Sequence, residues 1–276
     1  ETIARLRAQF GLDRPFHEQY LLWMHNLLHL NLGYSFAYQA PVLEIVWPRV
    51  LNSMVLVVPS TVLLFLIAVP VGVYGALRQY SLGDRVVSFL AIPNFFLALI
   101  LMYLVLQVYF RTGVMVFPVS GMTSSGFEQF SFWQKVVDVA WHAVLPIVVL
   151  TTSDIAGFSR IMRGQMLEAL SQDYVRTARA KGLPERVVVY KHALRNAIIP
   201  IVANIGGILP TLISGAGLVE VVTAWPGITP LLLDAISQQD LYVVAGFLTM
   251  GLVLLMIGNL LSDLLLAWVD PRIRYE

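Results

Sequence analysis

Long uncharged apolar runs alternate along this chain with shorter polar segments. Five of the runs are long enough, or nearly so, to cross a bilayer, which takes about 20 apolar residues. We therefore predict membrane-spanning helices at residues 51–77, 86–110, 139–159, 197–219 and 241–262. The third run carries a single acid, Asp154, and prolines and glycines interrupt the fourth. The pattern predicts an all-α fold class, a polytopic membrane helical bundle.

The composition is that of a membrane protein. Hydrophobic residues make up 58% of the 276 residues, charged residues make up 13%, and the mean hydropathy is +0.74. A soluble domain carries about 25% charged residues. The net charge of +1 gives no bulk attraction to nucleic acid, so we expect no nucleic-acid partner. The absence of cysteine excludes disulfides and thiolate metal sites.

The chain divides into an external segment, residues 1–49, and a transmembrane domain, residues 50–276. Within the first, residues 18–30 form an amphipathic stretch that is too short to span and is expected to lie at the membrane surface. The sequence does not begin with Met, and no signal-like run precedes Arg5 and Arg7. We therefore expect it to be part of a longer protein.

The basic residues predict the orientation. With alternating spans, twelve of the 18 Lys and Arg residues fall on the side that carries residues 78–85, 160–195 and the C-terminus. The other six fall on the opposite side. Since cytoplasmic loops are enriched in Lys and Arg, we assign the first side to the cytoplasm.

The longest polar segment between spans is the predicted cytoplasmic loop 166–197. Apolar side chains at helical spacing from Leu167 to Ala178 predict an amphipathic helix, which Gly182 can end in a left-handed conformation. Pro184 then suits the start of a second short helix through about Tyr190. Two interpretations stay open from the pattern alone: a docking surface for another protein, or a solvated basic connector at the anionic inner leaflet.

Three stretches carry a family resemblance. Residues 174–183, YVRTARAKGL, followed by HALRNA at 192–197 and by Pro200, resemble the signature loop of ABC-importer permeases. Within these they are most similar to the peptide/nickel branch, whose members import dipeptides and oligopeptides. The WPG sequence at 225–227 with Asp240 after it, and the tail DPRIRY at 270–275, resemble the same branch. The broad permease pattern has Glu-Ala-Ala where this chain has Arg176, Thr177 and Ala178, and the peptide branch resembles this chain in that departure.

The resemblance implies a type I importer permease, a binding-protein-dependent transport component of a bacterial-type cytoplasmic (inner) membrane. It implies a second homologous permease subunit, two ATP-binding subunits, an extracytoplasmic substrate-binding protein and surrounding membrane lipid as partners. Substrates would be di- or oligopeptides, with nickel chelates as a lesser possibility, and one further span would precede this sequence. The residues expected to dock an ATPase subunit are Ala178, Arg179, Ala180, Lys181, Gly182, Leu183, Pro184, Glu185 and Arg186.

The chain carries no recognisable motif for nucleotide binding or catalysis. It lacks a G-x-x-x-x-G-K-[ST] nucleotide loop, a G-x-S-x-G elbow and an H-E-x-x-H motif, so we predict no enzyme, no catalytic residues and no cofactor in this chain. A proton-coupled secondary transporter is the alternative. That would need buried acids or histidines in relay, and only Asp154 lies well inside a span.

Three further features allow two interpretations each. Asp154 either contacts a passing substrate, such as a peptide amino terminus, or lies in the bundle interior, protonated or paired with Arg160. Trp225 either belongs to a loop that receives substrate from a binding protein or sits in a Pro-Gly turn at the membrane interface. His25 and His29 have a metal-ligand spacing but no visible third ligand, so we predict surface histidines and no metal site.

Overall fold

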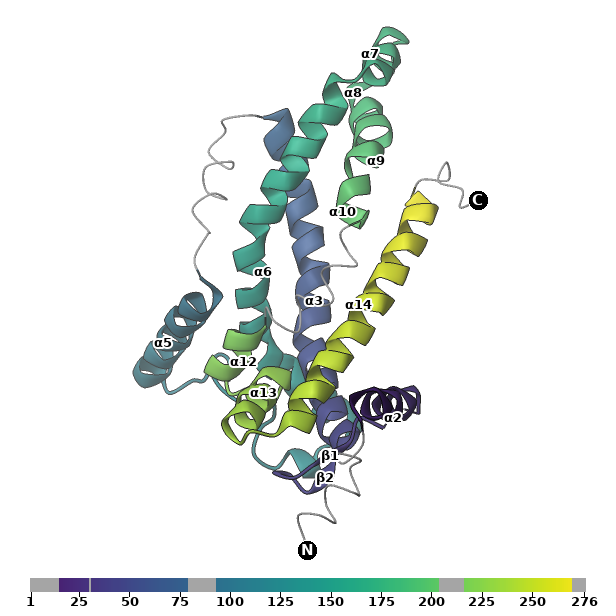
Figure 1. Ribbon diagram of the computed structural model, residues 1–276. Helices are drawn as coiled ribbons and strands as arrows, with labels where there is room; N and C mark the ends of the chain where they lie inside the picture. The colour runs from purple at the N-terminus through teal and green to yellow at the C-terminus, as the bar shows by residue number, and fades with distance from the viewer. Residues whose placement is uncertain (1–14, 30, 79–92, 204–215, 270–276) are drawn as a thin grey trace, which may run out of the picture.

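The computed structural model describes residues 15–29, 31–78, 93–203 and 216–269. Four helices in these ranges are long and apolar enough to cross a membrane. They are α3 (Val42–Leu77), α5 (Asn94–Thr112), α6 (Phe132–Ser171) and α14 (Leu241–Val269), shown in Figure 1. The predicted polytopic helical bundle is confirmed.

The fourth predicted span lies mostly outside the described residues. The structure describes the two ends of that region, α10 (Ile199–Ala203) and α12 (Gly217–Val222). The C-terminal tail 270–275 and the loop around residue 83 also lie outside the described residues.

Both α3 and α6 are longer than their predicted spans. Helix α3 begins at Val42, so the predicted boundary between residues 49 and 50 falls inside a helix. Helix α6 has 40 residues, which at 1.5 Å per residue is about 60 Å, twice the thickness of a bilayer's hydrocarbon core. The charge at Arg160 made the predicted span end early, but buried Met162, Met166 and Ala169 continue one apolar face beyond it.

Close contact through small residues joins α3 to α6. A side chain on Gly72 would place its Cβ 2.5 Å from Cβ of Met162 and 2.8 Å from the Ser159 carbonyl oxygen. The Ser159 hydroxyl donates to the Ala68 carbonyl at 3.4 Å, and the Thr151 hydroxyl donates to the Ser60 carbonyl at 3.3 Å. Glycine and hydroxyl side chains at such positions are typical of helix pairs in membranes.

The two ends of the bundle differ in what they carry (Figure 1). At one end lie α7 (Asp173–Ala180) and α8 (Glu185–Val187), which the Lys and Arg distribution assigns to the cytoplasm, and we call this the inner end. At the other, the outer end, lie α13 (Ile228–Ser237) and the two short strands β1 (Tyr34–Ser35) and β2 (Ala40–Pro41).

Asp240 holds the β1–β2 hairpin against the start of α14. Its Oδ2 accepts hydrogen bonds from the Ser35 hydroxyl at 2.6 Å and from the Ala37 amide at 3.2 Å, and its Oδ1 accepts from the Val243 amide. Burial alone would raise the pKa of Asp240, but these hydrogen bonds, together with one from the Tyr242 amide, lower it below the ordinary value. The residues just before α3 are thereby fixed to the last span.

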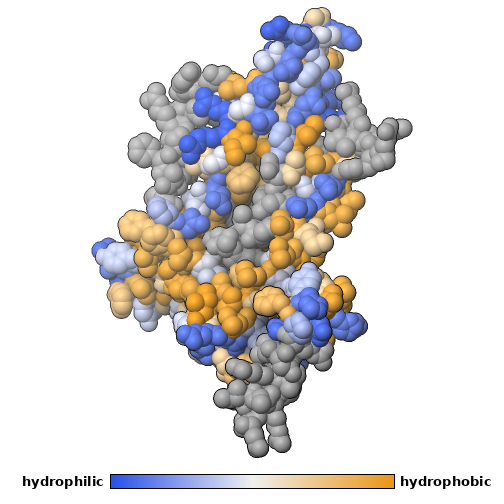
Figure 2. Space-filling model, in the orientation of Figure 1, coloured by the Kyte–Doolittle hydropathy of each residue, from blue (hydrophilic) through white to orange (hydrophobic). Residues whose placement is uncertain are grey.

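The amphipathic stretch predicted near the start is the helix α2 (Phe16–Leu28). None of its residues is buried, and it lies across the direction of the long helices near the outer end of α14 (Figure 1). Large apolar side chains also cover the middle of the molecule, while hydrophilic ones gather around α7 (Figure 2). On α14 the exposed stripe contains Leu252, Met256, Leu260 and Leu264. Such surfaces suit lipid or a partner helix.

We expect Gly72→Ala to destabilise the chain by about 1–3 kcal/mol, because the added methyl group overpacks the contact between α3 and α6. Thermal unfolding of the purified protein in detergent measures this. The matched control is Gly157→Ala on α6, where nothing in the described part of the chain lies within 4 Å of the added methyl carbon, and the effect should be within about 0.5 kcal/mol. Equal melting temperatures for the two variants would contradict the packing argument.

Candidate docking site

The predicted cytoplasmic loop is helical over most of its length. After α6 ends at Ser171, α7 follows, then α8, a π-helix (Val188–Ala193) and α9 (Leu194–Ala197). The prediction of one continuous helix from Leu167 to Ala178 is wrong, because Gln172 adopts an extended ψ of 152° between α6 and α7. The second predicted helix begins after Pro184 as expected, but it continues past Tyr190.

Gly182 makes the turn that follows α7. Its φ is +76°, the left-handed conformation that glycine adopts without steric cost. The Gly182 amide donates to the Arg179 carbonyl at 2.9 Å, and the Leu183 amide donates to the Ala178 carbonyl at 3.4 Å. These two bonds form a Schellman motif, which satisfies carbonyls at a helix end. The predicted helix end at Gly182 is confirmed.

An ion pair closes the same turn from outside. The guanidinium of Arg179 donates two hydrogen bonds to the carboxylate of Glu185, from Nη2 to Oε1 at 2.7 Å and from Nε to Oε2 at 3.1 Å. The hydrogen bond from Arg179 lowers the pKa of Glu185. Both side chains are exposed, so solvent screening limits the pair to about 0–1 kcal/mol. Its two-point geometry links the start of α8 to the end of α7.

One face of this segment is buried against the long helices. Val175 of α7 and Val188 and Val189 of the π-helix join an apolar cluster with Met166 of α6 and Val73 of α3. All five are at most 3% exposed. Because interiors are close-packed and do not deform easily, this face joins the segment rigidly to α3 and α6.

The other face is exposed and basic. Eight of the nine residues predicted to dock an ATPase subunit are exposed. The α7 end of the molecule, where this segment lies, is mainly hydrophilic in Figure 2. Ala178 differs, since it is 5% exposed and belongs to the buried apolar cluster. The structure therefore shows its side chain packed against this chain's own helices. Leu183 is 38% exposed, an apolar side chain between Lys181 and Arg186.

Asp154 is exposed on the surface of this chain, within the membrane-spanning part of α6. The described residues of this chain do not enclose it, and its contact with substrate stays a prediction. Among the described residues no ion pair joins Arg160 to Asp154, and Arg160 Nε donates to the Ala156 carbonyl of its own helix at 3.1 Å. Gly157, one turn along α6, is exposed too, and no described residue packs over it.

At the outer end, sequence reasoning missed a buried acid. Glu220 of α12 is 0% exposed, and its Oε1 accepts a hydrogen bond from the Ser53 hydroxyl of α3 at 2.5 Å. Its position inside the apolar run GLVEVV was a signal that it points inward. The interpretation of Trp225 as an interface residue is wrong, because Trp225 is 0% exposed and its Nε1 donates to the Asn52 carbonyl at 2.9 Å.

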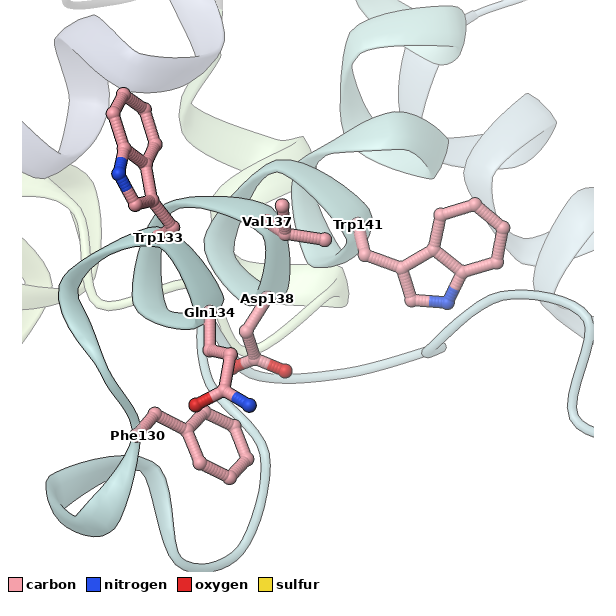
Figure 3. Close-up of a pocket in the computed structure, with 6 residues that line it drawn as sticks. All are labelled: Phe130, Trp133, Gln134, Val137, Asp138 and Trp141. Atoms are coloured by element: carbon pink, nitrogen blue, oxygen red, sulfur yellow. The ribbon is translucent and has the colours of Figure 1, made fainter.

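A shallow depression of about 420 Å³ lies at the start of α6 (Figure 3). Trp133 and Trp141 point away from each other, and Phe130 lies beside Gln134. The Asp138 carboxylate beneath them accepts from both the amide and the hydroxyl of Ser124, at 2.8 and 2.6 Å. Asp138 thus holds the preceding loop, and the exposed aromatic rings suit the membrane interface.

His25 of α2 lies beside His29, the residue that follows the end of this helix. His29 Nδ1 hydrogen-bonds to the His25 carbonyl at 2.8 Å. Within the described ranges no group of three or more His, Cys, Asp or Glu side chains could hold a metal ion.

Comparison with known families identifies the chain. The family model described as "Binding-protein-dependent transport system inner membrane component" matches residues 68–275. The chain belongs to this family. The matched region begins within α3 and includes residues 173–197, which we call the docking segment, and the outer α12–α13 region. The protein is therefore a multi-pass membrane component of a transport system and not an enzyme.

Several relatives match nearly the whole chain. It is 39% identical to the oligopeptide transport system permease protein AppB of Bacillus subtilis, over 97% of this chain and 83% of the relative. It is 36% identical to the dipeptide transport system permease protein DppB of Escherichia coli, over 100% of this chain and 86% of that protein. The oligopeptide transport system permease protein OppB of Mycobacterium tuberculosis is 36% identical over 96% of this chain and 82% of its own length. The expected resemblance to permeases is confirmed.

We expect Gly182→Val to destabilise the docking segment by about 1–2 kcal/mol, because a β-branched side chain disfavours the left-handed conformation. Gly182→Ala should destabilise the segment somewhat less, for the same reason. Gly182→Asn is the matched control, since asparagine tolerates this conformation and open space surrounds the position. Hydrogen exchange of the Gly182 and Leu183 region in the purified permease measures the loss. Exchange in the Val variant as slow as in the wild type would contradict the strained-turn explanation.

Proposed function

We propose that this chain is the membrane-spanning permease subunit of an ATP-driven, binding-protein-dependent importer for di- or oligopeptides. It pairs with a second homologous permease in a bacterial cytoplasmic membrane, and two ATP-binding subunits attach at the inner end. The relatives named as peptide permeases support the substrate class, and their bacterial sources support the membrane. A soluble binding protein delivers the peptide to the outer end.

The observation that carries this proposal is the two-sided docking segment. Its exposed tip offers Leu183, Lys181 and Arg186 to a partner, while its buried side packs on α3 and α6. An apolar side chain within a basic rim suits a groove that is apolar at its floor and acidic at its edge. Since the segment is held rigidly, movement of the partner is passed to the membrane helices as rigid-body motion.

A thiol crosslink tests this docking. The chain has no cysteine, so Arg186→Cys introduces one thiol at the tip. We expect a short thiol-reactive crosslinker to join this position to a co-purified ATP-binding subunit. The matched control is Ser237→Cys, an exposed position at the outer end, which should give no such product. Absence of the Arg186 product both with and without ATP, or an equal yield from position 237, would contradict the proposal.

Asp154 lines the translocation path in this proposal. A charged group facing lipid at the middle of a helix costs about 2.5–3.5 kcal/mol on insertion scales, so an exposed acid there is expected to face water or protein. An aqueous path between two permeases supplies such an environment. The carboxylate can then attract the ammonium group of a peptide amino terminus.

We expect Asp154→Asn to lower ATP-dependent peptide uptake by about fivefold, since removing a charge partner in a partly hydrated site costs about 1 kcal/mol. Uptake into vesicles with an ionophore present measures this without contribution from a proton gradient. Ser153→Ala is the matched control, because the Ser153 hydroxyl donates to the Leu150 carbonyl of its own helix. Unchanged uptake of several peptides by Asp154→Asn would remove Asp154 from the path.

A further inference from the structure

A buried carboxylate at the outer end joins the neighbouring helices α12 and α13 to α3, which is far from both in sequence. Glu220 of α12 accepts from the Ser53 hydroxyl of α3 through Oε1, and from the Thr229 amide of α13 through Oε2 at 3.0 Å. The oxygen of Ser53 accepts in turn from the Ile228 amide at 2.9 Å. Both side chains are at most 4% exposed. The first turn of α13 is thus capped by groups from two other helices.

The turn between α12 and α13 is shaped around this acid. Gly227 lies so close to the Glu220 carboxyl group that any side chain there would collide with it. The Trp225 amide donates to the Glu220 carbonyl at 2.8 Å, which closes the end of α12. The backbone on both sides of the turn is therefore fixed by one residue.

A second pair of hydrogen bonds ties the same turn to α3. Asn52 donates from Nδ2 to the Pro226 carbonyl at 2.9 Å, and its own carbonyl accepts from Trp225 Nε1 at 2.9 Å. Adjacent residues of α3, Asn52 and Ser53, thus hold the whole outer helical hairpin, residues 217–237. Buried polar groups joined in this way specify one arrangement, because breaking any bond leaves an unsatisfied partner.

The same helix α3 reaches the docking segment. Its other end supplies Val73 and Ala76 to the apolar cluster that buries Val175 and Val188. Helix α3 is continuous between these two attachments, from Asn52 to Ala76. Pro59 and Pro70 interrupt the backbone hydrogen bonds of α3 between these attachments, and α6 supports this stretch through the Thr151 and Ser159 hydroxyls. The outer helical hairpin and the docking segment are therefore attached to the same continuous helix.

We infer that Glu220 is a positioning residue for transport, which locks the outer helical hairpin to α3 so that the hairpin moves with the inner docking segment. This inference rests on the proposed function, in which the outer end receives a loaded binding protein and the inner end receives ATPase movement. Without these hydrogen bonds, the docking segment would still bind an ATP-binding subunit, but the outer helical hairpin would no longer move together with α3. Glu220 contributes through position and touches no substrate.

Two variants of the lock and one matched control test this in the complete complex with its binding protein. Glu220→Leu keeps a similar volume and removes both acceptors, and Ser53→Ala removes the shared hydroxyl. Ser60→Ala is the control, because Ser60 lies on the same helix, is equally buried, and its hydroxyl donates to the Val57 carbonyl within α3.

We expect Glu220→Leu and Ser53→Ala each to reduce stimulation of ATP hydrolysis by the peptide-loaded binding protein about fivefold or more, because each variant removes two buried hydrogen bonds. The basal hydrolysis rate should stay within about twofold of wild type, and Glu220→Gln, which keeps one acceptor, should recover part of the stimulation. In the purified permease, the Ile228 and Thr229 amides should exchange hydrogen faster in Glu220→Leu than in the wild type. Their exchange rates in Ser60→Ala should equal those of the wild type.

Stimulation that survives in Glu220→Leu, or unchanged exchange at Ile228 and Thr229, would overturn the inference. A parallel loss of basal hydrolysis would also overturn it, since that reports only misfolding or failed assembly. If the peptide-loaded binding protein does not stimulate ATP hydrolysis by the wild-type complex, that result contradicts the proposed function instead. The exchange measurement then still decides whether Glu220 holds the hairpin.

Discussion

Two helices surrounded by lipid gain little from hydrophobic burial, so the contact between α3 and α6 has to come from close packing. Gly72 permits that packing by leaving its side-chain space to Met162. The hydroxyl bonds from Thr151 to Ser60 and from Ser159 to Ala68 then fix how far one helix can slide along the other. The docking segment and the outer helical hairpin are both attached to this pair, and their relative position is only as fixed as this contact.

The two attachments to the pair use different chemistry. At the inner end, Val175, Val188 and Met166 make an apolar cluster under a charged, exposed tip, as in a soluble protein that binds a partner in water. At the outer end, Glu220 and Ser53 make buried polar bonds among otherwise apolar helices. Apolar residues alone would not specify the register there, because lipid is as apolar as the side chains that would replace them. Directional hydrogen bonds supply that specificity.

Much of this architecture could be predicted from periodicity and charge, and the errors have physical causes. Hydropathy located four spans in the described ranges but ended α6 too early, because charges such as Arg160 do not stop a helix that still buries Met162 and Met166. The turn at Gly182 was predictable from local chemistry, whereas the break at Gln172 was not. Glu220 escaped attention because sequence spacing cannot reveal that Ser53, on a distant helix, would meet it. Tertiary packing likewise explains why Ala178 is buried while its neighbours are exposed.

An isolated copy of this chain leaves several surfaces without a suitable environment. Asp154 is exposed at membrane depth, where lipid would impose a cost of about 2.5–3.5 kcal/mol. Beside it no described residue packs over Gly157, so another helix could approach the α6 backbone closely. At the inner end the charged side chains of the tip are well solvated in water, but the described part of the chain leaves the apolar side chain of Leu183 38% exposed among them. In the proposed assembly a second permease would cover α6 at Asp154 and Gly157, and an ATP-binding subunit would cover Leu183. The family assignment to a component of a transport system agrees with such uncovered surfaces.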